Sequence, residues 1–362
     1  MRIPALILVS CLASVVRAES GSAGPFLYTH FNSFTFSETT SIDSLLHDFR
    51  GDIRSGERAS TFNRADVGVR YQWLSLGYQQ RYDYFLRFSN DVARTYHASA
   101  HDEVLPDGHS ADVFIQASQI RAKGATLGIH LAPLPQLQLS VVLARLTAHS
   151  MVDGEASGEL AVTDEDSYDG AVDFLLYSSE DLLLEMPVPD PVGKGYAADV
   201  MIDWEMTDRW QIGLRVFDAY SRIEWEDVLY SDLHANTATV SYDENGQLHT
   251  DPVLYGYQFL TDTTQTLPRK YQGRLAYRLA GQHRVWMEQF YVPEYASQST
   301  LGYEYAFGDQ RRLGGYWNVS TRAVGVTGQW HWLTWQLGTD NLDGREAMAW
   351  DLALGLQIPL FW

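Results

Sequence analysis

The end of the chain alternates between two kinds of side chain over thirteen positions, and this period restricts the fold more than any other feature. One face carries only large apolar residues: Trp350, Leu352, Leu354, Leu356, Ile358, Leu360 and Trp362. The opposite face is mostly small or polar. A period of two predicts a β-strand with two different faces. Strands of globular proteins usually have about five or six residues, whereas a tilted membrane strand needs roughly nine to eleven.

Hairpins with the same period recur along the chain. Short turns are expected at 73–74, 132–135, 207–209, 280–282 and 308–310. They alternate with long polar segments at 94–111, 145–170, 178–195 and 226–270. Short turns on one rim and long loops on the other are typical of a membrane barrel. We therefore predict an all-β fold, a closed antiparallel transmembrane β-barrel of about 14 strands (12 to 16), with short periplasmic turns and long extracellular loops.

The first 18 residues have the pattern of an export signal. Arg2 provides a positive charge, and the 14 residues from Ile3 to Val16 are apolar. This apolar stretch falls short of the roughly 20 residues that span a bilayer as a helix. We predict cleavage after Ala18; a lipoprotein signal ending at Cys11 is an alternative. The mature chain would be one barrel domain over 19–362, without cysteine, and the expected location is the outer membrane of a Gram-negative bacterium.

The last eight residues, Gly355 to Trp362, place a glycine before alternating apolar residues and an aromatic end. This segment resembles the terminal strand signal of Gram-negative outer-membrane β-barrel proteins, the porin-like superfamily. The resemblance implies recognition by the barrel assembly machinery through Gly355, Ile358, Leu360 and Trp362. It departs from the usual pattern at Ala353, where a polar residue is expected, and at Pro359, which lacks a backbone donor. No particular family within the superfamily is identified.

Composition excludes several functions. The formal charge is -20, from 26 Lys and Arg against 46 Asp and Glu. A nucleic-acid partner is not expected, because phosphate backbones are met by cations. The single cysteine argues against a disulfide scaffold or a thiolate zinc site. The mean hydropathy of -0.22 is compatible with a barrel, in which only every second strand residue faces lipid.

Charged residues on the polar strand face are the candidates for a pore lining, because they would point inward when the apolar face meets lipid. They are Arg70, Arg81, Asp83, Arg87, Arg215, Arg274, Arg278, Glu304 and Asp351. Arginine offers a fixed fork to carboxylate or phosphate. Two interpretations stay open: a selective lining that attracts anionic groups, or a structural network of paired charges.

Acidic residues concentrate in 151–173 and 224–251, which we expect to be solvated outer loops that favour cations at the mouth. The spacing in 164–170 does not fit a calcium loop. His97 and His101 are placed in a loop rather than on one face of a helix, so no metal site is expected there. No sequence motif of a hydrolase or a phosphate loop is present, and no catalytic residue or cofactor is assigned.

A short helix is predicted at 41–50, capped by Ser41 or Asp43, within a segment (41–58) that could lie on the rim, in the lumen or as a loop. The leading hypothesis for function is an outer-membrane channel or transporter for small or chain-like hydrophilic solutes by passive diffusion. A non-transporting structural or assembly barrel and a membrane-embedded hydrolase are the alternatives. Expected partners are outer-membrane lipid and lipopolysaccharide, the assembly machinery and an unidentified hydrophilic solute.

Overall fold

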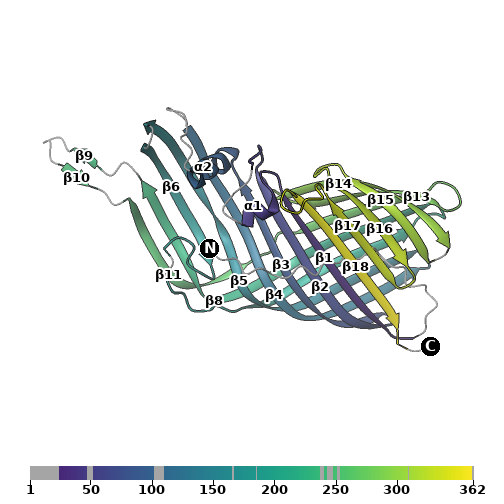
Figure 1. Cartoon of the computed structure of the whole chain (residues 1–362). Coiled ribbons are helices and arrows are strands. Elements are labelled where there is room, and N and C mark those ends of the chain that lie inside the picture. Colours follow the sequence, from purple (N-terminus) through teal and green to yellow (C-terminus); the bar gives the residue numbers. More distant parts are fainter. Residues whose placement is uncertain are drawn as a thin grey trace.

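The computed structural model describes residues 24–46, 52–101, 110–164, 167–184, 186–236, 240–242, 248–250, 253–308 and 310–360. The predicted signal at 1–18 and Trp362 lie outside these residues. The described chain forms a closed antiparallel barrel of 14 strand positions, as the alternation predicts. The first strand, β1 (Phe26–Ser37), pairs with the last, β18 (Ala349–Pro359), and this seam closes the barrel (Figure 1).

Sixteen strand segments fill the 14 positions, because two positions are each shared by two segments. Between β5 and β8, β6 pairs with the upper part of both neighbours and β7 with the lower part. On the other side of β8, β11 lies above β12. The segments from β2 to β8 are β2 (Arg58–Tyr71), β3 (Leu74–Phe88), β4 (Ser110–Leu134), β5 (Leu137–Asp164), β6 (Ser167–Ser178), β7 (Gly193–Glu205) and β8 (Trp210–Asn236). The later ones are β11 (Leu254–Gln265), β12 (Lys270–Arg278), β13 (His283–Val292), β14 (Ala296–Gly308), β15 (Arg311–Asn318), β16 (Val324–Trp330) and β17 (Leu333–Thr339).

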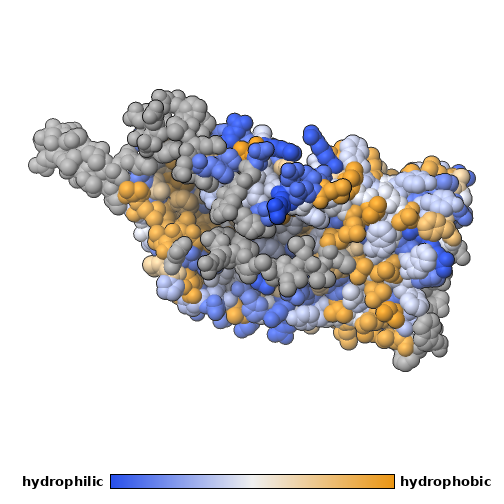
Figure 2. Space-filling model, in the orientation of Figure 1, coloured by the Kyte–Doolittle hydropathy of each residue, from blue (hydrophilic) through white to orange (hydrophobic). Residues whose placement is uncertain are grey.

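One rim of the barrel consists of tight turns, which we call the short-turn rim. Five of its connections lie close to the predicted positions: 72–73, 135–136, 206–209, 279–282 and the β14–β15 turn. A further turn at 331–332 was not predicted. Above it, every second residue faces outward and is apolar and exposed. Examples are Leu76, Leu127, Leu143, Leu214, Met287, Leu301, Val326 and Leu337. Figure 2 shows this apolar surface over part of the barrel. Such a belt is the arrangement expected for strands that face lipid.

The wall has two heights. β4, β5 and β8 are 25, 28 and 27 residues long, whereas β15, β16 and β17 have only 8, 7 and 7. The expectation of long loops at 145–170 and 226–270 is therefore wrong in large part. Small and polar residues there continue the alternation, so the strands project beyond the apolar belt. A separate hairpin of β9 (Val240–Tyr242) and β10 (Leu248–Thr250) lies between β8 and β11.

Two helices lie at the upper end. In α1 (Ile42–Leu46) the Ser41 hydroxyl accepts the Ser44 N–H at 3.1 Å, as predicted. In α2 (Asn90–Ala100) Ser89 caps the first turn. The loop expected around His97 is therefore wrong, because Ser89 and the apolar face of Val92 and Ala93 start a helix. Leu45 and Ala93 pack with Phe88 of β3, on the face opposite the lumen, so α1 is a rim element. None of the described helices is long and apolar enough to cross a membrane.

Close packing of tyrosine against glycine fixes the short wall. Tyr316 of β15 points inward, and its hydroxyl donates to Asp351 at 2.8 Å. A Cβ at Gly338 would lie 2.1 Å from the Tyr316 hydroxyl, and one at Gly325 would lie 2.2 Å from the ring. Only glycine fits at these two positions, so the ring lies flat across β16 and β17.

Candidate functional site: a plugged lumen above a polar cavity

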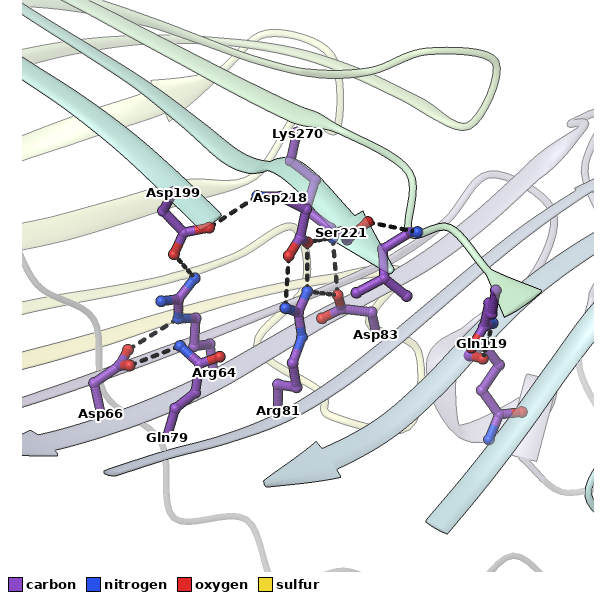
Figure 3. A network of polar contacts seen from close by, with 12 residues as sticks. Arg64, Asp66, Gln79, Arg81, Asp83, Gln119, Asp199, Asp218, Ser221 and Lys270 are labelled. Carbon is purple, nitrogen blue, oxygen red and sulfur yellow. Dashed lines mark hydrogen bonds and ion pairs between the residues drawn. The ribbon is translucent and has the colours of Figure 1, made fainter. Parts of the chain in front are cut away.

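A buried ionic cluster crosses the lumen at mid-height (Figure 3). Arg81 of β3 donates to both carboxylate oxygens of Asp218 in β8, at 2.7 and 2.5 Å. Its guanidinium also contacts Asp83, at 2.5 Å. Lys270, the first residue of β12, donates to Asp83 at 2.9 Å and to Asp218. We call these four residues the ionic plug.

A second set of contacts joins the wall beside the plug. Arg64 of β2 contacts Asp199 of β7 at 2.6 Å and Asp66 at 3.0 Å. Gln79 donates to Asp66 at 2.8 Å. The Asp218 N–H donates to Asp199 at 2.8 Å, which links this set to the plug.

The plug closes the lumen to water at this level. Its members are at most 2% exposed: Arg81 2%, Asp83 2%, Asp218 1% and Lys270 0%. Charged side chains in an open aqueous pore would be solvated rather than buried. Such burial is tolerated because each cation meets two carboxylates in direct contact, whereas an unpaired ion would be very costly.

Two irregularities in the wall bring Asp218 and Lys270 into the lumen. The register between β7 and β8 shifts between Ala198 and Val200, and Asp218 takes a positive φ of 53°. Phe217 and Asp218 therefore both point inward, against the strict alternation of a regular strand. Between β11 and β12 the chain leaves the sheet at 266–269, where Leu267 is buried and its N–H donates to Ser221 at 2.9 Å.

Aromatic residues pack around the plug. Phe62 contacts Phe217 and Phe290, with ring centroids 5.5 and 5.9 Å apart. The Lys270 ammonium lies 5.6 Å from the Phe62 ring and 5.5 Å from the Phe85 ring, which favours the cation. The β13–β14 turn reaches across to Phe85 through Tyr295, and burial raises the pKa of Tyr295 to about 12. The plug thus stands between an aromatic floor below and an apolar contact above.

Below the plug, a cavity of about 920 Å³ extends to the short-turn rim. Phe34, Phe62, Phe217 and Phe290 form its closed end, and residues of the turns at 207–209, 281–282 and 331–332 line its mouth. Amide side chains are frequent on its wall: Asn32, Gln211, Gln272, Gln282, Gln298, Gln310, Asn318, Gln329, Gln336 and Gln357. This wall offers many hydrogen bonds to a polar solute.

Charged residues line the same cavity. The arginines are Arg209, Arg215, Arg274, Arg278, Arg284 and Arg312, and the carboxylates are Asp203, Glu205, Asp208, Glu288, Glu304 and Asp351. Arg274 donates to Glu304 at 2.9 Å and stacks on Trp286 at 4.1 Å from the ring centroid. Arg284 contacts the other Glu304 oxygen at 3.5 Å and donates to Gln211 at 2.7 Å.

The nine charged residues chosen from the sequence separate into three groups. Five line the cavity: Arg215, Arg274, Arg278, Glu304 and Asp351. Arg81 and Asp83 belong to the ionic plug. Arg70 lies near the short-turn rim over Phe26, and Arg87 lies above the plug over Phe114. The sequence missed Arg64, Asp199, Asp218 and Lys270. The sequence held one indication of Asp218, because the run Phe217-Asp218 breaks the alternation of β8.

The described acidic residues of 151–173 and of 224–236 lie on strands rather than in loops, which corrects the sequence-based expectation; residues 165–166, 243–247 and 251–252 lie outside the described residues. Asp153, Glu155, Glu159 and Asp173 share the face of the upper wall that continues the lumen. There, Asp173 contacts His234 at 2.5 Å and Asp232 accepts from Tyr257 at 2.9 Å. Within the described residues no group of three metal-ligating side chains occurs. The His97 and His101 rings lie 4.4 Å apart.

One serine–histidine arrangement occurs inside the lower barrel. The His130 ring lies between the hydroxyls of Ser75 and Ser140, 2.9 Å from each. Among the described residues, no carboxylate hydrogen-bonds to this ring. Ser75 is only 4% exposed, so a substrate ester could not reach it. The arrangement therefore lacks both the orienting acid and the access that nucleophilic catalysis needs.

Of the predicted assembly signal, Gly355 and Ile358 lie in β18, and Leu360 follows it and is 44% exposed. β18 ends at Pro359, where a missing N–H is tolerated. Recognition of this segment by an assembly machinery stays a prediction.

No protein-family model matches the sequence, and no curated protein matches it. Solved structures match over most of the chain at low identity. The toluene transporter TodX of P. putida is 9% identical over 94% of this chain and 91% of its own, with a TM-score of 0.43. The toluene transporter TbuX of Ralstonia pickettii is 9% identical over 93% and 90%, with a TM-score of 0.35. The siderophore receptor PirA of Acinetobacter baumannii is 8% identical over 93% and 81%, with a TM-score of 0.23.

These likenesses concern the barrel architecture alone. The closed barrel predicted from the sequence is confirmed by the structure itself, and the resemblance to outer-membrane barrels stays a prediction. The solutes of these transporters and of this receptor concern those proteins alone.

Proposed function

We propose that this chain is an outer-membrane barrel that conducts small hydrophilic solutes through a gated lumen. Its outward apolar belt and the closed ring of paired strands from β12 through β18 and β1 to β8 meet the requirements of a bilayer, in which backbone groups cannot remain unpaired. The short-turn rim is assigned to the periplasmic side. Passive flow through a permanently open pore, the simplest form of the sequence-based hypothesis, does not fit a plug that is at most 2% exposed.

One observation carries the proposal. The polar cavity extends from the short-turn rim to the level of the plug, where ion-paired side chains of β3, β8 and β12 close it among the described residues. Ion pairs between wall strands can exchange partners without unfolding a strand. A gate of this kind needs only a modest shift of β8 and β12, where the strands are already irregular.

The test is conductance of the purified full-length protein in planar bilayers. We expect brief, rare openings of the wild type and more frequent openings of Asp218→Asn, which removes one carboxylate from the plug. Glu224→Gln serves as the matched control, since it removes a carboxylate whose side chain is 66% exposed on the outer face. It should behave as the wild type.

The wild type, Asp218→Asn and Glu224→Gln must first show the resistance to unheated SDS that is typical of a folded barrel. If every folded variant, including Asp218→Asn, fails to conduct at any voltage, the proposal is wrong. The chain would then be a non-transporting structural barrel.

A further inference from the structure

We propose that the lower cavity binds solutes that carry an oxyanion, a carboxylate or a phosphate, through arginines of β12, β13 and β15. This inference rests on the proposed conduit and names its substrate class. It starts from the register of the strands, which arranges the inward residues of the wall in rows across the barrel.

The row nearest the mouth places two arginines side by side. Arg278 of β12 is directly opposite Arg284 of β13, and Arg284 is directly opposite Glu304 of β14. Arg312 of β15 lies opposite Ala306, two residues beyond Glu304. Like charges directly opposite on neighbouring strands destabilise a sheet. A bound anion would remove this repulsion.

Three carboxylates of the cavity already accept hydrogen bonds from wall side chains. Glu304 is shared by Arg274 and Arg284, and Glu288 accepts from Gln272 at 2.9 Å. Asp351 accepts from Tyr316 and Gln336, at 2.8 and 2.7 Å. Asp203 of β7 faces Arg274 across Gly213 of β8, whereas Glu205 and Asp208 belong to the end of β7 and its turn. Among the residues that line the cavity, the wall from β12 to β15 therefore carries Arg274, Arg278, Arg284 and Arg312 together with Glu288 and Glu304.

Two buried donors lie beside the cavity without a partner among the described residues. Gln298 is 4% exposed and its Nε2 has no partner among the described residues, nor has the Nε of Arg274. The Gln272 Oε1 is the one unpartnered acceptor among these lining residues. Buried donors normally find an acceptor. The arginine forks at the mouth fit a ligand that is rich in acceptors and negatively charged.

The test is calorimetric titration of the full-length protein in a neutral detergent at low salt, with inorganic phosphate and succinate as anionic probes and glucose as the neutral probe. We expect both anions to bind and glucose to bind at least tenfold more weakly. The double substitution Arg278→Gln and Arg284→Gln should weaken phosphate binding at least tenfold. The control Arg222→Gln removes an arginine that is 58% exposed on the outer face, and it should leave binding unchanged.

Equal binding of glucose and phosphate, or phosphate binding that survives the double substitution, overturns the inference. A further arm adds a water-soluble short-chain phosphatidylglycerol, since a lipid headgroup carries the same phosphate chemistry. Binding of the lipid alone also overturns the assignment to a free solute.

Failure of this inference is distinct from failure of the conduit. Conductance of Asp218→Asn without phosphate binding refutes the oxyanion site and leaves the gated conduit standing. Phosphate binding without conductance in any folded variant refutes the gated conduit and leaves the oxyanion site standing.

Discussion

Replacing Asp218 by asparagine tests whether the ionic plug is dry and structural. Asparagine keeps the shape of the side chain and tolerates the left-handed φ of 53° that Asp218 adopts, so the backbone of β8 should be unchanged. The substitution removes the charge and replaces one carboxylate oxygen, an acceptor for Arg81 or Lys270, with an amide donor. Arg81 and Lys270 would then share a single carboxylate, Asp83, where the wild type provides two.

The magnitude follows from burial. The side chains of Arg81, Lys270 and Asp218 are at most 1% exposed, so the surplus cation cannot be hydrated in place. Breaking a buried ion pair by removing one partner costs about 3–5 kcal/mol. We expect the free energy of unfolding to fall by about 4 kcal/mol, which is roughly a thousandfold in the folding equilibrium.

The assay is equilibrium urea unfolding of the full-length protein in lipid vesicles, followed by tryptophan fluorescence. Glu224→Gln should change the free energy of unfolding by less than about 0.5 kcal/mol, because exposed ion pairs contribute little. Adding Lys270→Met to Asp218→Asn removes the surplus cation and should recover a large part of the loss. A loss below about 1 kcal/mol for Asp218→Asn would refute the reasoning, because it would mean that water reaches these charges.

Three further predictions concern other parts of the barrel. Asp199→Asn should cost only about 2 kcal/mol in urea unfolding, since Arg64 keeps Asp66 as a partner; a loss equal to that of Asp218→Asn would contradict this ranking. Gly338→Ala forces a Cβ to within 2.1 Å of the Tyr316 hydroxyl, so it should destabilise the barrel by about 1–3 kcal/mol and lower the temperature at which it loses SDS resistance. Gly273→Ala meets its nearest neighbour at 3.5 Å and is the control; equal behaviour of the two variants would disprove the steric argument. Burial alone would raise the pKa of Asp181, but the backbone N–H groups of Leu184, Leu183 and Met186 donate to it and hold the pKa below its usual value. The stabilisation of this loop by ionised Asp181 should therefore be present at neutral pH. It should be lost as the pH falls below the ordinary value of 3.8 and through the folded pKa, with faster amide exchange in 181–186; exchange that does not change with pH would contradict it.

Alternation along the sequence predicts the parts of this fold that depend on local geometry. The strand count, the outward belt and turns such as 207–209 follow from the period of two and from residues that favour turns. The height of the wall does not follow, because the segment around Gly154 and Gly158 is small and polar in sequence and still pairs as a strand. Composition alone does not distinguish such a strand from a loop.

The plug could not be predicted because it depends on pairing between distant segments. Arg81 and Asp218 are 137 residues apart, and Asp218 faces inward only because the register of β7 and β8 shifts beside it. A one-residue shift exchanges the two faces of a strand. Lys270 follows an irregular stretch at 266–269, which no periodicity describes.

The seam between β1 and β18 has a consequence for how the molecule is made. Phe26 pairs with Pro359, so ring closure waits for nearly the whole described chain. Until then β1 and β18 each expose an unpaired edge, which readily joins a foreign strand. Pairing of such distant segments is slow, because the entropy of closing the loop is lost before any contact compensates. Biogenesis should therefore depend on a catalyst that shields both edges, and a nascent chain stopped before β18 should aggregate rather than persist as a partial barrel.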